Sequence, residues 1–176
     1  LEELNRYDML ALVVDIRTNP GGSSEAAVET AAQFLPDGTL FGYVEGKDGQ
    51  RTEITTGPNE NRLSLDDLLV AVLINEKTSR EAETLAAALH DSGRATLFGT
   101  TTLGDASSYE FVELSDGSAM YLPVARRFSL KGELMTTAGI VPDVEVESVA
   151  EDKGYGGESQ FNRAYEFLDS QLPLFR

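Results

Sequence analysis

The sequence has no cysteine, no tryptophan and a single histidine among 176 residues. Without cysteine the chain has neither a disulfide nor a thiolate nucleophile, and its composition is compatible with an exported protein. One histidine and no cysteine argue against a zinc site. The acidic residues show no EF-hand spacing, so the sequence predicts no calcium site either. We therefore expect no metal and no other cofactor.

Basic residues are also scarce. The chain has 14 lysines and arginines against 30 aspartates and glutamates, which gives a formal net charge of −16. The acidic residues are spread along the chain, so nucleic acid and anionic membrane surfaces are poor partners. No apolar run approaches the ~18–20 residues of a membrane-spanning helix, and we expect no membrane insertion.

Apolar residues are plentiful enough to form a core. They make up 41% of the chain, which predicts one domain over residues 1–176. The opening "LEELNRYD" reads as the end of a helix that is already under way, and no signal peptide precedes it. We therefore expect a domain that is truncated at its N-terminus.

Hydrophobic patterning alternates between strands and helices. Continuous apolar runs predict strands buried on both faces, and apolar residues at helical spacing predict amphipathic helices. The second half of the chain is richer in strand-like sequence, so the fold class is α/β with a β-rich second half. The strands are predicted at 10–16, 68–75 and 95–99, hairpins at 39–57 and 109–128, and helices at 24–35, 80–93 and 160–172.

A strand-to-helix corner, "DIRTNPGGSS", follows the first buried strand. Gly21 and Gly22 have no Cβ, so their backbone N–H groups can face outward beside the positive end of the following helix. This arrangement predicts a site for a carboxylate, phosphate or oxyanion. The alternative is a tight turn in which the glycines only supply unusual dihedral angles.

A second corner, "VLINEKTSREAET", follows the buried strand at 68–75. Thr78 and Glu81 have the spacing of a capping box, which predicts that the Thr78 hydroxyl accepts a backbone hydrogen bond. Arg80 then lies in the first helical turn, where its positive charge opposes the helix dipole. The pattern therefore predicts an acidic partner for Arg80.

Four segments together resemble the catalytic core of the C-terminal processing (tail-specific) serine proteases. They are "LVVDIRTNPGG", "VLINEKTSREAETLAAALHDSGRATLFGTTTLGD", "LSDGSAMYLPVARRF" and "GIVPDVEVE". The resemblance implies a core of mixed sheet and helices related to the ClpP/crotonase fold. Family members are typically exported to the periplasm or the thylakoid lumen, and they usually carry a PDZ domain, which this chain lacks. They cleave near the C-terminus of protein substrates with a Ser–Lys dyad.

Carried over residue by residue, the resemblance places Arg80 at the position of the serine nucleophile. The family's lysine lies 25 residues further on, where this sequence has Asp105, and the glutamine that supports the lysine is replaced by Tyr109. Gly21 and Gly22 match the glycines that line the oxyanion hole. An acidic residue after the nucleophile helix corresponds to Asp91.

Arginine and aspartate do not replace the dyad chemically. Arginine remains protonated, with a pKa above about 12, and aspartate has no neutral amine to act as the general base. The substitutions instead predict an Arg80–Asp105 ion pair and a catalytically degenerate domain that binds peptides or protein C-termini. A bound peptide would add a strand beside the sheet.

Two other functions stay open. An active serine endopeptidase would need a shifted nucleophile, for which Ser79 is the first candidate and Thr78 or Ser107 the next. A structural domain would bind no peptide and would serve oligomerisation, and the sequence leaves the oligomeric state open. His90, late in its helix, is expected at the surface.

Overall fold

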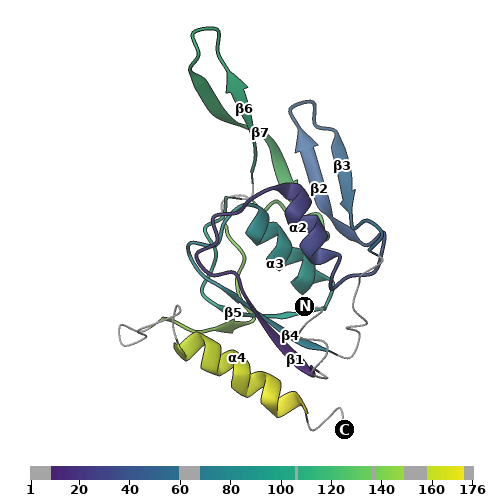
Figure 1. The fold of residues 1–176 in the computed structure, drawn as a ribbon, viewed down its shortest axis with the longest axis vertical. Helices are drawn as coiled ribbons and strands as arrows, with labels where there is room; N and C mark the ends of the chain where they lie inside the picture. Colours follow the sequence, from purple (N-terminus) through teal and green to yellow (C-terminus); the bar gives the residue numbers. More distant parts are fainter. Residues whose placement is uncertain (1–8, 60–67, 106, 136–137, 149–157, 173–176) are drawn as a thin grey trace.

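The computed structural model describes residues 9–59, 68–105, 107–135, 138–148 and 158–172 (Figure 1). Strands and helices alternate in the first part of the chain, and strands dominate the later part. The described elements are β1 Ala11–Asp15, α2 Ser24–Ala31, β2 Leu40–Gly46, β3 Arg51–Thr55, β4 Leu69–Ile74, α3 Glu81–Asp91, β5 Thr96–Gly99, β6 Ser108–Glu113, β7 Ala119–Phe128, β8 Val144–Glu145 and α4 Glu158–Gln171.

A parallel sheet forms the centre of the fold. Its strand order is β1-β4-β5-β8, and β4 pairs with β1 on one edge and β5 on the other. Residues 70–74 of β4 are all buried. Because side chains alternate between the two faces of a strand, both faces of this sheet must be covered.

Helices cover both faces of the parallel sheet. On one face, Val72 and Ile74 belong to a core cluster with residues of α2 and α3. On the other face, Leu73 and Phe98 pack with Ala164 of α4. Figure 1 shows α4 on the opposite side of the sheet from α2 and α3. α4 thus packs directly on the sheet, and α2 packs mainly on α3, which lies between it and the sheet.

A second, antiparallel sheet has the order β3-β2-β7-β6 and consists of two hairpins. The hairpins are joined where residues Tyr43 to Gly46 of β2 pair with residues Ala125 to Phe128 of β7. Beyond this junction the hairpins separate, and Figure 1 shows β6 and β7 projecting from the rest of the molecule.

The predicted α/β fold class is confirmed, together with both hairpins and the buried strands at 68–75 and 95–99. The strand predicted at 10–16 forms as β1, but it is not buried on both faces, because it is an edge strand whose residues are partly buried or exposed. The mixed sheet is in fact two sheets, because the β2–β3 hairpin from the first half pairs with β7 from the second half. The helix predicted at 24–35 ends at Ala31. The next amides, of Gln33 and Phe34, bond three residues back in tight turns that lead into Pro36.

Candidate functional site

The corner between β4 and α3 presents the side chain of Arg80. Arg80 precedes the helix with φ 56° and ψ −120°, and within the described residues only Thr18 is another non-glycine residue with positive φ. Such a backbone conformation costs about 1–3 kcal/mol and persists only where other contacts fix it. The carbonyl of Arg80 accepts a hydrogen bond from the Thr84 amide at 3.1 Å. The hydrogen bonding of the first turn of α3 therefore helps to hold Arg80 in this strained conformation.

Arg80 contacts Asp105, as the sequence predicts. Arg80 Nε lies 3.3 Å from Asp105 Oδ2, and the two side chains are 36% and 28% exposed. The Tyr109 hydroxyl donates to the same carboxylate at 3.1 Å. The predicted Arg80–Asp105 ion pair is thus confirmed. Because the pair is partly exposed, its net contribution to stability is small, about 0–1 kcal/mol.

Two tyrosines form an aromatic wall beside the ion pair. The guanidinium carbon of Arg80 lies 4.8 Å from the ring centre of Tyr109 and 5.8 Å from that of Tyr121. The two rings stack, with centres 4.9 Å apart. Burial, followed by the hydrogen bond to Asp105, raises the pKa of Tyr109 above 10.0, although the charge of Arg80 opposes this shift. Tyr109 is therefore protonated at neutral pH and remains a donor to Asp105.

Glu83 holds this arrangement together from inside the protein. Its side chain is fully buried, and its carboxylate accepts from the backbone N–H of Arg80 at 3.0 Å, of Gly104 at 2.7 Å and of Asp105 at 2.9 Å. The Thr102 hydroxyl donates to the same carboxylate. One buried carboxylate thus ties the Arg80 corner to the loop that carries Asp105. Sequence reasoning missed this residue, although a glutamate three residues after a helix cap is its signal.

The predicted capping box is wrong, because the helix begins two residues later than the pattern suggests. The cap residue is Arg80, and Glu83, not Glu81, bonds back to it. The Thr78 hydroxyl instead donates to the carbonyl of Ile16 at 3.0 Å and accepts from the Asn75 amide at 3.1 Å. It therefore links β4 to β1 and does not cap α3.

Ser79 and Ser107, the other alternative nucleophiles, lie in different surroundings. Ser79 is 5% exposed, and its backbone N–H donates to the carbonyl of Asn19 at 3.0 Å. Among the described residues, no lysine or histidine forms a hydrogen bond with the Ser79 hydroxyl. Ser107 lines a groove between the two hairpins. Among the described residues, no lysine or histidine forms a hydrogen bond with the Ser107 hydroxyl either, although Lys47 lines the same groove.

The Pro-Gly-Gly corner meets the start of α3. A Cβ on Gly21 would lie 2.9 Å from the Cβ of Arg80, so only glycine fits there. The Gly21 amide donates to Asn19 Oδ1 at 2.9 Å, and the Gly22 amide donates to Glu81 Oε2 at 3.1 Å. The predicted anion-binding amides thus already hold side-chain oxygens of the chain itself. A ligand oxygen must displace Glu81 to reach the Gly22 amide.

Arg127 of β7 forms an ion pair with Glu81. It is 3% exposed, and one of its terminal nitrogens donates to Glu81 Oε1 at 3.0 Å and to the Ser24 hydroxyl at 2.7 Å. Burial lowers the pKa of Arg127, and the charge of Glu81 opposes that shift. The buried pair fixes β7 to the starts of α2 and α3. Sequence reasoning gave no role to Arg127.

Asp91 does not belong to this cluster. It lies at the other end of α3, about 15 Å along the helix from its start. Asp91 Oδ1 lies 2.8 Å from Lys131 Nζ and 3.4 Å from His90 Nδ1, and His90 Nε2 lies 3.0 Å from Asp143 Oδ1. The hydrogen bond and charge of Asp91 raise the pKa of Lys131 above 10.5. His90 is partly exposed, close to the surface position expected of it.

In the part of the chain that the structure describes, no three histidine, aspartate or glutamate side chains are grouped so as to hold a metal ion. Within the same residues, no helix has both the length and the apolar character needed to cross a membrane.

Comparison with known proteins identifies the family. The model of peptidase family S41 matches residues 1–146. The chain is 34% identical over 145 residues to carboxyl-terminal-processing peptidase 3, chloroplastic, from Arabidopsis thaliana, covering 82% of this chain and 27% of that protein. It is 33% identical over 147 residues to the carboxy-terminal processing protease CtpA of Bacillus subtilis (strain 168), covering 84% of this chain and 31% of the relative.

Solved structures agree with this assignment. The photosystem II D1 C-terminal processing protease superimposes with a TM-score of 0.72 at 32% identity, over 82% of this chain and 36% of that one. A lipoprotein from Streptococcus agalactiae, 20% identical, shares the fold with a TM-score of 0.74, over 92% of this chain and 55% of the other. The chain spans about a third of the length of the curated relatives named above. It is a C-terminal processing peptidase-like domain and belongs to peptidase family S41.

Proposed function

We propose that this domain has lost peptidase activity and binds peptide or protein segments at the corner where its relatives cleave them. The observation that carries the proposal is the Arg80–Asp105 pair, 3.3 Å apart at the start of α3. On the family's motif these two residues take the places of the nucleophile and the general base. A guanidinium has no nucleophilic electron pair at neutral pH, and the carboxylate is already engaged by Arg80 and Tyr109.

The arrangement suits binding better than cleavage. Within the described residues, the hydrogen bond of the Arg80 side chain goes from Nε to Asp105, which leaves its terminal nitrogens to face a ligand. A guanidinium matches a carboxylate in planar geometry and charge. Tyr109 and Tyr121 add an apolar wall next to that charge. We therefore propose the free C-terminus of a peptide or protein as the ligand, with its carboxylate at Arg80 and its last side chain against the tyrosines.

Export is a further part of the proposal. It is supported by the lack of cysteine and by the name of an Arabidopsis relative, which is called chloroplastic. Periplasmic, lumenal and secreted locations are all compatible with these observations.

The loss of activity is tested with a fluorophosphonate probe and with casein as an unstructured substrate. We expect neither labelling nor cleavage by the wild-type chain, because among the described residues no lysine or histidine forms a hydrogen bond with the Ser79 hydroxyl. A triple variant, Arg80→Ser with Asp105→Lys and Tyr109→Gln, restores the family's residue types at the three positions, and we expect it to be labelled. Labelling of the wild type that disappears in Ser79→Ala would overturn the proposal in favour of a shifted nucleophile.

Binding is tested separately by fluorescence anisotropy with a labelled peptide library that carries either a free or an amidated C-terminus. We expect peptides with a free carboxylate and an apolar last residue to bind, and their amides to bind at least tenfold more weakly. Arg80→Gln should remove this preference, whereas Arg163→Gln on the exposed side of α4 should not. Equal binding of acids and amides by the wild type would contradict the proposed ligand.

A further inference from the structure

A groove lies between the two hairpins, and it is distinct from the Arg80 corner. Residues 45–47, 49, 107 and 123–126 line it, and it encloses about 460 Å³. We call it the hairpin groove. Neither Arg80 nor Asp105 is among its lining residues. Any ligand bound there would contact β2, the turn after β2 and the middle of β7.

One wall of the hairpin groove continues into a free strand edge. The pairing of β2 with β7 ends at Gly46 and Ala125, because β2 then turns back into β3. Residues 119–123 of β7 pair with β6 and with no other described strand, and Val124 lies at a register shift next to them. Along this stretch Met120 is 43% exposed and Val124 is 41% exposed. An unpaired edge that carries exposed apolar side chains is a template for an added strand.

The hairpin groove gathers positive charge in an acidic protein. Arg126 lies opposite Glu45 in the strand register, but Glu45 forms its ion pair with Arg51 at 2.9 Å. Within the described residues, neither Arg126 nor Lys47 has a carboxylate within 4.0 Å. The adjacent Asp48 accepts a hydrogen bond from the Gln50 amide, within its own turn.

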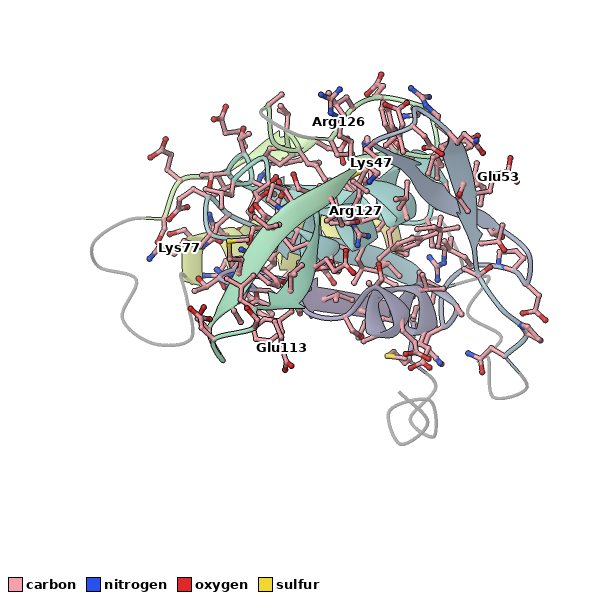
Figure 2. The ribbon with its side chains drawn as sticks, turned by 90° about the horizontal axis from the view of Figure 1, so that it is seen from above. Lys47, Glu53, Lys77, Glu113, Arg126 and Arg127 are labelled. Atoms are coloured by element: carbon pink, nitrogen blue, oxygen red, sulfur yellow. The ribbon has the colours of Figure 1, made fainter. Side chains whose placement is uncertain are left out.

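These cations lie together at one side of the molecule. Figure 2 shows Lys47 and Arg126 close to each other, whereas the exposed Lys77 lies away from them, at the left of the view. Because the chain as a whole carries a charge of −16, an acidic ligand is repelled from most of its surface and attracted here.

We propose that the hairpin groove binds an extended acidic segment of a protein partner. The segment adds a strand to the free edge of β7 and places carboxylates against Lys47 and Arg126. Alternate side chains of a strand point to the same side, so acidic residues at every second position meet the cations together. This inference rests on residues that the proposed function does not use.

The test uses fluorescence anisotropy with a labelled peptide of four Glu-Val repeats that carries a C-terminal amide. The amide keeps the Arg80 corner out of the measurement, so failure here is distinguishable from failure of the proposed function. We expect binding at low salt that weakens at least tenfold in the double variant Lys47→Glu with Arg126→Glu. Lys77→Glu reverses a single positive charge away from the groove, and we expect less than a twofold change for it.

Backbone pairing is tested with the same peptide N-methylated at every second residue, which should lose at least tenfold in affinity. If the charge-reversed double variant does not fold, Lys47→Gln with Arg126→Gln takes its place, with at least a threefold loss expected. No binding by the wild type at 1 mM peptide overturns the proposal. Equal binding of a Lys-Val peptide, or unchanged binding by either double variant, overturns it as well.

Discussion

The two ends of α3 use their charges in different ways. At the N-terminal end, the carboxylates of Glu81 and Glu83 are 12% exposed and fully buried, and both accept hydrogen bonds from other parts of the chain. At the C-terminal end, the Asp91 side chain is itself only 9% exposed, but its partner Lys131 is 52% exposed, so the ion pair is open to solvent on the lysine side. Buried, multiply bonded groups cost several times more to remove than exposed ion pairs do. The N-terminal end therefore fixes the geometry of the site, and the C-terminal end contributes little to it.

The hydrogen bonds at the N-terminal end of α3 also explain how the strained backbone of Arg80 persists. A positive φ at a non-glycine residue persists only where neighbouring contacts determine it. Here the Arg80 amide bonds to Glu83, and its carbonyl bonds to Thr84. The first turn of α3 thus holds the Arg80 side chain where it reaches Asp105.

Glu83→Gln should have the largest effect. The amide group of glutamine would bring an N–H donor against backbone donors that now share one buried carboxylate. We expect the free energy of unfolding to fall by about 2–4 kcal/mol, measured by urea denaturation. Glu25→Gln, at an exposed position in the first turn of α2, is the matched control and should change it by less than about 0.5 kcal/mol. A loss below about 1 kcal/mol for Glu83→Gln would contradict the role given to this carboxylate.

Arg80→Gly and Arg80→Ala together isolate the backbone strain. Both variants lose the same side-chain contacts, but only glycine adopts φ 56° freely. We expect the glycine variant to be about 1 kcal/mol more stable than the alanine variant. The same two substitutions at Arg163, within α4, should give the opposite order, because alanine is favoured by about 1 kcal/mol in a regular helix. An alanine variant as stable as the glycine variant at position 80 would show that the corner is unstrained.

Lys131→Met, at the other end of α3, should have the smallest effect. The pKa of Lys131 is raised in the folded protein by Asp91, so the stabilisation is complete below pH 10.5 and is lost as the pH rises through that raised pKa. We expect a small decrease in the urea midpoint at pH 7 that disappears in 1 M NaCl or at a pH above the raised pKa of Lys131. Lys77→Met should show no such dependence, since no carboxylate pairs with Lys77 in the described residues. An effect as large as that of Glu83→Gln would contradict the comparison of the two ends.

Much of the fold follows from local pattern. The apolar run at 68–75 predicts a strand covered on both faces, and the structure places helices on both faces of β4. The family motifs fix the spacing of Arg80 and Asp105, and two opposite charges at positions that meet in the fold form the expected pair. These features depend on the period of a strand or on a linear motif, and both are readable in the sequence.

The roles of two neighbouring glutamates were decided only by the tertiary structure. Glu81 and Glu83 both lie in the first turn of α3, but Glu81 turns to Gly22 and Arg127, and Glu83 turns to the loop before Asp105. Their partners lie roughly 20 to 60 residues away in the sequence.

The length of a helix removed Asp91 from the site, and long-range strand pairing created the hairpin groove. The length of α3 puts Asp91 about 15 Å from the Arg80 corner. The pairing of β2 with β7 brings Lys47 and Arg126 to one groove, although they lie far apart in the sequence. The sequence by itself determined the elements and the residue types at the corner. Which side chains share a buried site was set by three-dimensional contacts, because hydrogen bonds and ion pairs form between groups that folding brings together, regardless of their sequence separation.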